Sequence, residues 1–143
     1  MTKRILAPIG AEERSEAIVP LVAALARESG ATVRLLRVFP VPERILATNG
    51  RTVAYVDQEM ARLTDEGLEE LARIETALPG VPVERIVRFG DPEEEILVEA
   101  EAFGADLIAL TTTTRGRTQR FIAPDVADRV AGSATVPTLV LHG

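Results

Sequence analysis

Four consecutive threonines followed by an arginine and a glycine stand where an α/β protein of this pattern would hold a phosphate. They are Thr111 to Thr114, Arg115 and Gly116, and they follow the apolar run from Asp106 to Leu110. In α/β proteins, phosphates are commonly bound by a loop of this kind, at the end of a strand. Such loops use glycine because it permits positive φ and lets backbone N–H groups approach phosphate oxygens. Threonine does neither well, so the stretch has the position of a phosphate loop but lacks its glycines.

The residues after this loop also disfavour a phosphate. Pro124 has no backbone N–H to donate. We expect Asp125 to be the N-cap of a helix that begins at Val126, so its carboxylate would stand where a helix N-terminus attracts anions. At about 4 Å in a partly exposed site, repulsion between two like charges is on the order of a few kcal/mol.

Three arginines between the threonines and this helix leave a second interpretation open. Guanidinium groups of Arg115, Arg117 and Arg120 can bind phosphate bidentately without help from the backbone. In the interpretation we favour, they pair with Asp125 or Asp128 or remain solvated, as most exposed charges do. The threonine hydroxyls likewise suit an anion, but we favour structural hydrogen bonds to nearby backbone.

Other groups that could do chemistry have structural explanations. His142 is the only histidine and lies near the carboxyl terminus, so we expect a surface or dimer-edge residue rather than part of a Ser-His-Asp triad. Asp91 and Glu94 have the spacing of a helix N-cap and its capping box, with Pro92 at the first helical position. We therefore predict no catalytic residues.

An acidic series follows Asp91 along the same predicted helix. It lacks the mixture of ligands typical of a metal site, and we expect a solvated helix face and no bound metal. The residues are Glu93, Glu94, Glu95, Glu99 and Glu101.

Length and composition indicate one domain spanning residues 1–143, with 46% hydrophobic residues to form a single core. The net charge of -6 argues against nucleic acid or an anionic membrane as a partner. There is no cysteine, which excludes disulfides and thiolate metal sites. Neither a leader-like pattern nor a membrane-length apolar run is visible, so we expect a cytoplasmic protein.

Apolar strands alternate with helical patterns along the chain. The predicted strands are Arg4 to Ile9, Thr32 to Phe39, Val83 to Phe89, Asp106 to Thr111 and Val136 to Leu141. The predicted helices run from Ser15 to Gly30, from Val53 to Leu78, from Pro92 to Gly104 and from Asp125 to Val130. This order predicts an α/β fold, a parallel sheet with helices on both faces. Its ligand crevice would lie between the turns after the first and fourth strands.

The long connection from Pro40 to Arg51 exceeds the usual length between a strand and a helix. It could cover the crevice or pack across a dimer, and the sequence does not decide between them.

Five segments resemble the universal stress protein family in their order and spacing, over nearly the whole chain. They are Ile5-Leu6-Ala7-Pro8-Ile9, Gly90-Asp91-Pro92, Gly104-Ala105-Asp106-Leu107-Ile108, Val126-Ala127-Asp128-Arg129-Val130 and Val136-Pro137-Thr138-Leu139-Val140. The resemblance implies an open five-stranded parallel sheet of order 3-2-1-4-5, like that of adenine nucleotide alpha hydrolases. It also implies a structural role for Asp106 and a homodimer formed through the carboxyl-terminal edge strand, Val136 to Leu141.

Some members of that family bind ATP through a signature of three glycines and a serine or threonine. The four signature positions fall on Thr111, Thr114, Pro124 and Asp125, and the family's aspartate after the first strand falls on Gly10. All five positions depart from the nucleotide-binding pattern. The resemblance therefore implies a degenerate nucleotide-binding site.

Two functions remain in competition. We expect a non-catalytic, dimeric stress-response protein that acts through other proteins and needs no cofactor. The alternative is a nucleotide-binding switch or slow ATPase that holds ATP or AMP with its arginines. In that case the contacts implied by the resemblance are Pro8, Ile9, Gly10, Val38, Leu110, Thr111, Thr114, Arg115, Gly116, Asp125 and Val126. A two-component receiver domain is set aside because no acidic cluster follows the first strand. An ATP pyrophosphatase is set aside because the Ser/Gly-rich loop of those enzymes is absent after the first strand.

Overall fold

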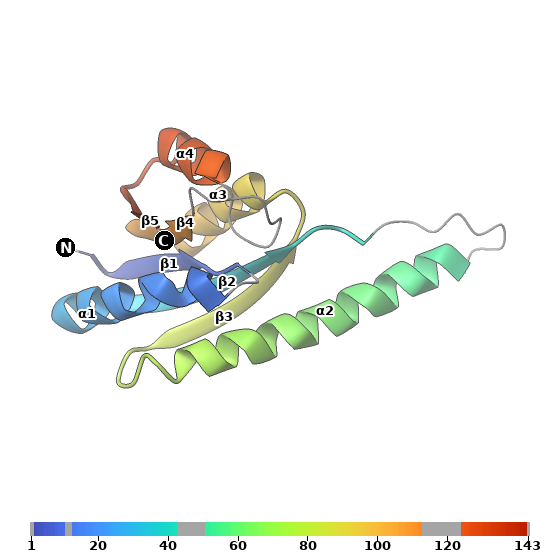
Figure 1. Cartoon of the computed structure of the whole chain (residues 1–143), viewed down its shortest axis with the longest axis horizontal. Coiled ribbons are helices and arrows are strands. Elements are labelled where there is room, and N and C mark those ends of the chain that lie inside the picture. The colour runs from blue at the N-terminus through green and yellow to red at the C-terminus, as the bar shows by residue number, and fades with distance from the viewer. Residues whose placement is uncertain (1, 11–12, 43–50, 113–123, 143) are drawn as a thin grey trace.

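Five parallel strands form one sheet in the order β3-β2-β1-β4-β5, as expected (Figure 1). The computed structural model describes residues 2–10, 13–42, 51–112 and 124–142. The strands are β1 (Arg4–Pro8), β2 (Thr32–Phe39), β3 (Val83–Phe89), β4 (Leu107–Thr112) and β5 (Thr138–His142). The helices are η1 (Glu13–Ile18), α1 (Val19–Ser29), α2 (Arg51–Glu75), α3 (Pro92–Phe103) and α4 (Pro124–Ser133).

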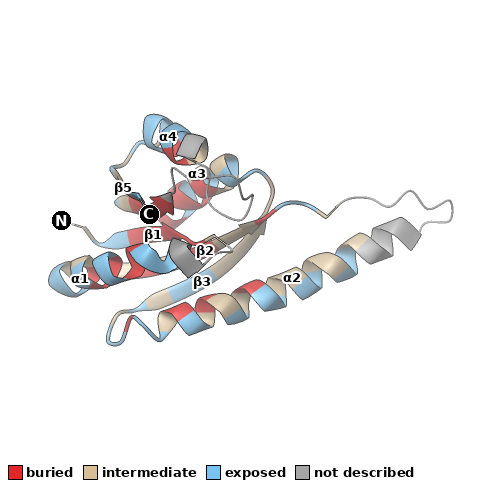
Figure 2. Ribbon diagram, in the orientation of Figure 1, coloured by how far each residue is buried: buried red, intermediate tan, exposed pale blue. Residues whose placement is uncertain are grey.

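Side chains that alternate along the strands form one core on each face of the sheet. Ile5, Ala7 and Leu35 pack with α1 and the carboxyl-terminal half of α2 on one face. Leu6 and Leu36 pack with α3 and α4 on the other. Buried residues therefore line both sides of the sheet, as a parallel sheet between two helical layers requires (Figure 2).

The first helical segment differs from the uniform helix predicted from Ser15. It opens as the 3-10 helix η1 and becomes α-helical only at Val19. Pro20, in the first turn of α1, has no N–H to donate to the carbonyl four residues earlier, so a regular α-helix cannot run through this point.

Other boundaries also differ from the prediction. Helix α4 begins at Pro124, whose fixed φ suits the first helical position, so Asp125 lies within the first turn and is not the N-cap. Strand β5 begins at Thr138 rather than Val136. Helix α2 ends at Glu75, and tighter turns continue to Leu78, whose N–H donates to the carbonyl of Glu75 at 2.9 Å.

The predicted cap of α3 is confirmed. Asp91 has an extended backbone, and its carboxylate accepts the N–H of Glu94 at 3.1 Å. Pro92 follows at the first helical position, and Gly104 ends the helix in the left-handed conformation at φ 69°. The local sequence alone therefore determines both ends of this helix.

Asp106 fastens the start of β4 to the start of β1. Its carboxylate accepts the backbone N–H groups of Lys3 at 2.7 Å and Arg4 at 2.9 Å, which confirms its structural role. These two bonds, that of Lys3 first, lower the pKa of the Asp106 carboxyl. Because the folded pKa is lowered, the stabilisation is present above the unfolded pKa and is lost as the pH falls through the folded value.

The expected solvated acidic face of α3 is wrong for three of its five glutamates. Glu99 is 1% exposed and forms ion pairs with Arg34 of β2 and, at 3.0 Å, with Arg88 of β3. Glu95 pairs with Arg88 at 2.8 Å, and Glu93 pairs with Arg129 of α4 at 3.3 Å. Only Glu94 and Glu101 are exposed as expected.

The two strand arginines explain this burial. Arg34 lies over the ring of Phe103 at 4.2 Å and also pairs with Glu84 at 2.6 Å. Sequence periodicity did not reveal that Arg34 and Arg88 point from the sheet toward α3. Since the buried carboxylate of Glu99 has two cationic partners, it ties α3 to two strands at once.

Replacing Glu99 tests this connection. Glu99→Gln leaves the charges of Arg34 and Arg88 less compensated beside a buried amide, and should lower the free energy of unfolding by about 3 kcal/mol. Glu84→Gln removes a half-exposed partner of the same Arg34 and should cost below about 1 kcal/mol. Urea unfolding followed by circular dichroism measures both. Equal losses in the two variants would contradict the special role of Glu99.

Candidate functional site

The carboxyl ends of β1 and β4 mark the position at which proteins of this fold bind their ligands. The two strands pair directly, through Ile5 with Leu107 and Leu6 with Ile108, and the winding of the chain reverses between them. The carboxyl ends of these two strands therefore lie side by side in the sheet. The strand order is the one from which the sequence predicted this position, and the site itself stays a prediction.

Residues at the end of β1 form the first part of this candidate site. Pro8 ends the strand, and Ile9 is 4% exposed and donates its N–H to the carbonyl of Leu36 at 2.8 Å. Gly10 is half-buried and offers no side chain for a ligand. Thus the position of the family's nucleotide-contacting aspartate carries no functional group.

Thr111 of β4 is the second part of the candidate site, and its hydroxyl already accepts a hydrogen bond. The side chain is 4% exposed, and its Oγ1 accepts the N–H of Ile18, at the end of η1, at 3.1 Å. This confirms a structural use of Thr111, although the backbone partner lies in another element, 93 residues away in the chain. The bond fastens η1 against the carboxyl end of β4.

Three further predicted contact residues lie within one core cluster. Leu110 is fully buried, and Val38 and Val126 are partly buried against the same cluster on the α3 and α4 face. The structure thus brings them together as packing residues.

The central part of the predicted anion loop lies outside the described residues. This applies to Thr114, Arg115 and Gly116, to Arg117 and Arg120, and to positions 43–50 of the long connection. Asp125 lies in the first turn of α4, which places a residue with a negative side chain near the positive end of that helix.

Other candidate groups remain separate in the described part of the chain. His142 ends β5, opposite Thr112 of β4, and is exposed. Within the described ranges, no group of three His, Asp or Glu side chains has the arrangement of a metal site. No helix among these residues is long and apolar enough to cross a membrane.

Sequence reasoning missed a cluster at the carboxyl ends of β2 and β3. Phe39 and Phe89 stack with centroids 5.8 Å apart, and Arg37 lies over the Phe39 ring at 4.2 Å and pairs with Glu70 of α2 at 3.3 Å. Gly67 of α2 allows the close contact, because an added Cβ would stand 2.8 Å from Val87. Gly67, a glycine on the buried side of a long helix, was the sequence signal that could have indicated this close contact.

The fold and the crevice together define a doubly wound α/β protein of the adenine nucleotide alpha hydrolase-like class. The sequence profile of the Universal stress protein family matches residues 1–142. The chain belongs to this family.

Solved structures agree with this assignment, whereas no curated protein sequence matches the chain. Hypothetical protein MJ0577 is 26% identical, with a TM-score of 0.80 over 100% of this chain and 97% of that one. Universal stress protein UspA from Lactobacillus plantarum is 18% identical, with a TM-score of 0.71 over 98% and 97%. A universal stress protein in complex with cAMP is 15% identical, with a TM-score of 0.65 over 99% and 97%.

The hydroxyl of Thr111 can be tested directly. Thr111→Val keeps the shape but leaves the buried N–H of Ile18 without this acceptor, and should lower the free energy of unfolding by about 1 to 3 kcal/mol. Amide hydrogen exchange should accelerate at Ile18. Thr111→Ser is the matched control, since it keeps the oxygen and should preserve protection at Ile18. Identical exchange at Ile18 in both variants would show that the hydrogen bond is unimportant.

Proposed function

We propose that this protein is a non-catalytic, dimeric universal stress protein that acts through contacts with other proteins. It does not bind ATP in the pose of its nucleotide-binding relatives. The observation that carries the proposal is the buried hydrogen bond between the Ile18 N–H and the hydroxyl of Thr111.

Thr111 stands where the nucleotide-binding signature begins with glycine. Its hydroxyl accepts the N–H of Ile18 in η1, and it has a branched side chain where a glycine would have none. A ligand that displaced this contact would leave the Ile18 N–H unpaired, at a cost of about 1 to 3 kcal/mol. This cost makes the binding free energy of a ligand near Thr111 less favourable.

Gly10, Pro124 and Asp125 act in the same direction. Gly10 supplies no carboxylate for an adenosine, and Pro124 at the start of α4 removes one of the N–H groups that a helix end offers to an anion. Asp125 in the same turn adds a negative charge. Together these residues disfavour both the nucleoside and the phosphates.

The second candidate function is nucleotide binding through arginines, with or without slow ATP hydrolysis. A relative with this fold has been solved in complex with cAMP, which favours a search for ATP or AMP binding here. Arg115, Arg117 and Arg120 would then replace the glycines as phosphate ligands.

The two edges of the sheet support a dimer through β5. Edge strand β3 carries Glu84, Arg85 and Arg88, and charged side chains on an edge oppose pairing with another chain. Edge strand β5, with the sequence TLVLH, carries no acidic residue, lysine or arginine. We place the contact between subunits at β5 because only this edge lacks such protection.

The register shows which backbone groups of β5 are available to a partner. The N–H of Ile108 donates to the carbonyl of Pro137 at 3.0 Å, and Ile108 pairs with Thr138. In a parallel ladder this directs the N–H of Leu139 toward β4 and that of Val140 outward. Val140 is therefore the position at which to test pairing between subunits.

Calorimetric titration of ATP, ADP and AMP, with and without magnesium, tests the absence of nucleotide binding. We expect no binding tighter than about 10 μM, roughly -7 kcal/mol. Asp125→Ser restores the residue type of the signature and removes the negative charge, so it should improve whatever affinity remains. Asp128→Asn, also on α4, is the charge control and should have little effect. Low-micromolar ATP binding by the unaltered protein would establish the second function instead.

A proline at Val140 tests the dimer. Val140→Pro removes an outward N–H from the edge strand and should convert the dimer to a monomer. Val140→Ala loses a comparable apolar contact but keeps the N–H, and should remain dimeric. Light scattering of both variants measures the mass. A dimeric proline variant, or a monomeric unaltered protein, would refute the interface.

A further inference from the structure

A groove between α1 and α2 lies on the face of the sheet opposite α3 and α4. Its volume is about 460 Å³, within the range of roughly 300 to 1,000 Å³ typical of small-molecule sites. Val19 and Ala23 of α1 and Ile74 of α2 form an apolar floor and are each 3–4% exposed. Pro20 and Ala77 complete the apolar lining. Apolar side chains from two helices therefore line the middle of the groove.

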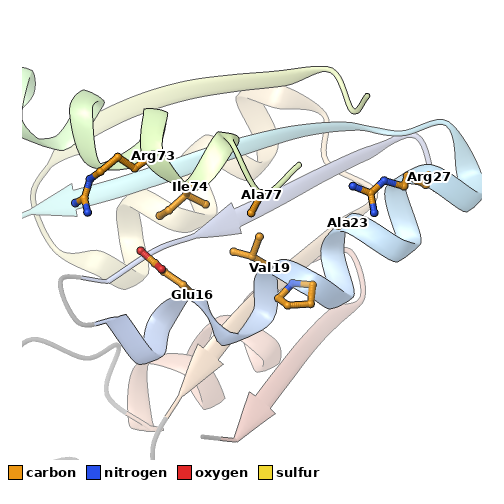
Figure 3. A pocket seen from close by; sticks show the side chains of 8 residues that line it. Glu16, Val19, Ala23, Arg27, Arg73, Ile74 and Ala77 are labelled. Carbon is orange, nitrogen blue, oxygen red and sulfur yellow. The ribbon is translucent and has the colours of Figure 1, made fainter. Parts of the chain in front are cut away.

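Charged side chains stand at both ends of this floor. Figure 3 shows Arg73 and Glu16 at one end and Arg27 at the other, with Val19, Ile74 and Ala77 between them. The Arg73 end has one charge of each sign, whereas the Arg27 end has an arginine alone. The net charge of the lining is thus positive, in a chain whose total charge is -6.

A hydrogen bond holds the Arg27 side chain at its end of the groove but does not neutralise the charge of the guanidinium. Its Nη2 donates to the carbonyl of Pro79 at 3.3 Å, which anchors the side chain beside the turn after α2. Among the described residues, neither Arg27 nor Arg73 forms an ion pair, although most arginines on β2, β3 and α2 do. A guanidinium has five N–H donors in a planar fork that matches a carboxylate. Arg27 therefore retains donors for an anion.

From these observations we propose that the α1 and α2 groove binds an amphiphilic monocarboxylate. The carboxylate pairs with Arg27, and an alkyl or aryl body lies over Val19, Ala23 and Ile74. The carboxylate belongs at Arg27 because Glu16 offsets the charge of Arg73 at the other end. Between the Cα atoms of Glu16 and Arg27 the helical rise is about 17 Å, which accommodates a medium-length chain. This site does not depend on whether the crevice at β1 and β4 binds a nucleotide.

Calorimetry with decanoate, acetate and decanol separates the two parts of this recognition. Decanoate should bind once per chain with submillimolar affinity. Acetate lacks the apolar body and decanol lacks the charge, so each should bind at least tenfold more weakly. Equal affinity for decanol would overturn the role of Arg27, and equal affinity for acetate would overturn the role of the floor. Absence of saturable decanoate binding would overturn the site itself.

Three variants locate the binding to the groove. Arg27→Gln changes an exposed side chain and should weaken decanoate binding roughly 10- to 100-fold. Ala77→Leu fills the groove from its exposed margin and should abolish binding without a loss of stability. Arg62→Gln, on α2 but outside the groove, is the control and should bind as the unaltered protein does. Unchanged binding in both groove variants would overturn the assignment. A change in the molecular mass of Ala77→Leu in solution would also overturn it, because it would indicate that the groove is a contact between copies of the chain.

Discussion

The pairing of β1 with both β2 and β4 is the interaction on which the rest of the structure depends. It makes the winding of the chain reverse at the centre of the sheet, so that segments far apart in sequence meet at both ends of β4. Asp106 fastens the first end through the N–H groups of Lys3 and Arg4, and Thr111 fastens the second through that of Ile18. Both are side chains bonded to distant backbone. Both ends of β4, including the end at the candidate site, are therefore held by such hydrogen bonds.

The hydrogen bond at Thr111 is a structural use of a position where the family's nucleotide-binding signature has glycine. Where a glycine would leave backbone groups open to phosphate, Thr111 satisfies the backbone of η1. The ion pairs of Glu99 likewise serve the fold, because these charged residues hold α3 on β2 and β3. Fold alone does not decide between these uses, since function resides in particular side chains.

Much of this architecture could be predicted from local pattern. Strands β2 and β3 have their predicted bounds, and Asp91 and Gly104 delimit α3 as capping chemistry requires. The misplaced starts of α1 and α4 both involve a proline, whose effect depends on which turn of the helix it enters. The acidic face of α3 was misjudged because the direction of Arg34 and Arg88 depends on sheet register, which no local pattern reports.

By itself, the sequence determined the order of strands and helices, the family and the absence of signature glycines, because periodicity, caps and residue type are local properties. Only the tertiary structure decided that the hydroxyl of Thr111 holds Ile18, that Glu99 is buried between two arginines, and that α1 and α2 enclose an apolar groove ending at Arg27. Each of these depends on elements brought together across the sheet. The physical reason is that hydrogen bonds and ion pairs need a specific partner in space, whereas a helix or strand needs only a pattern along the chain.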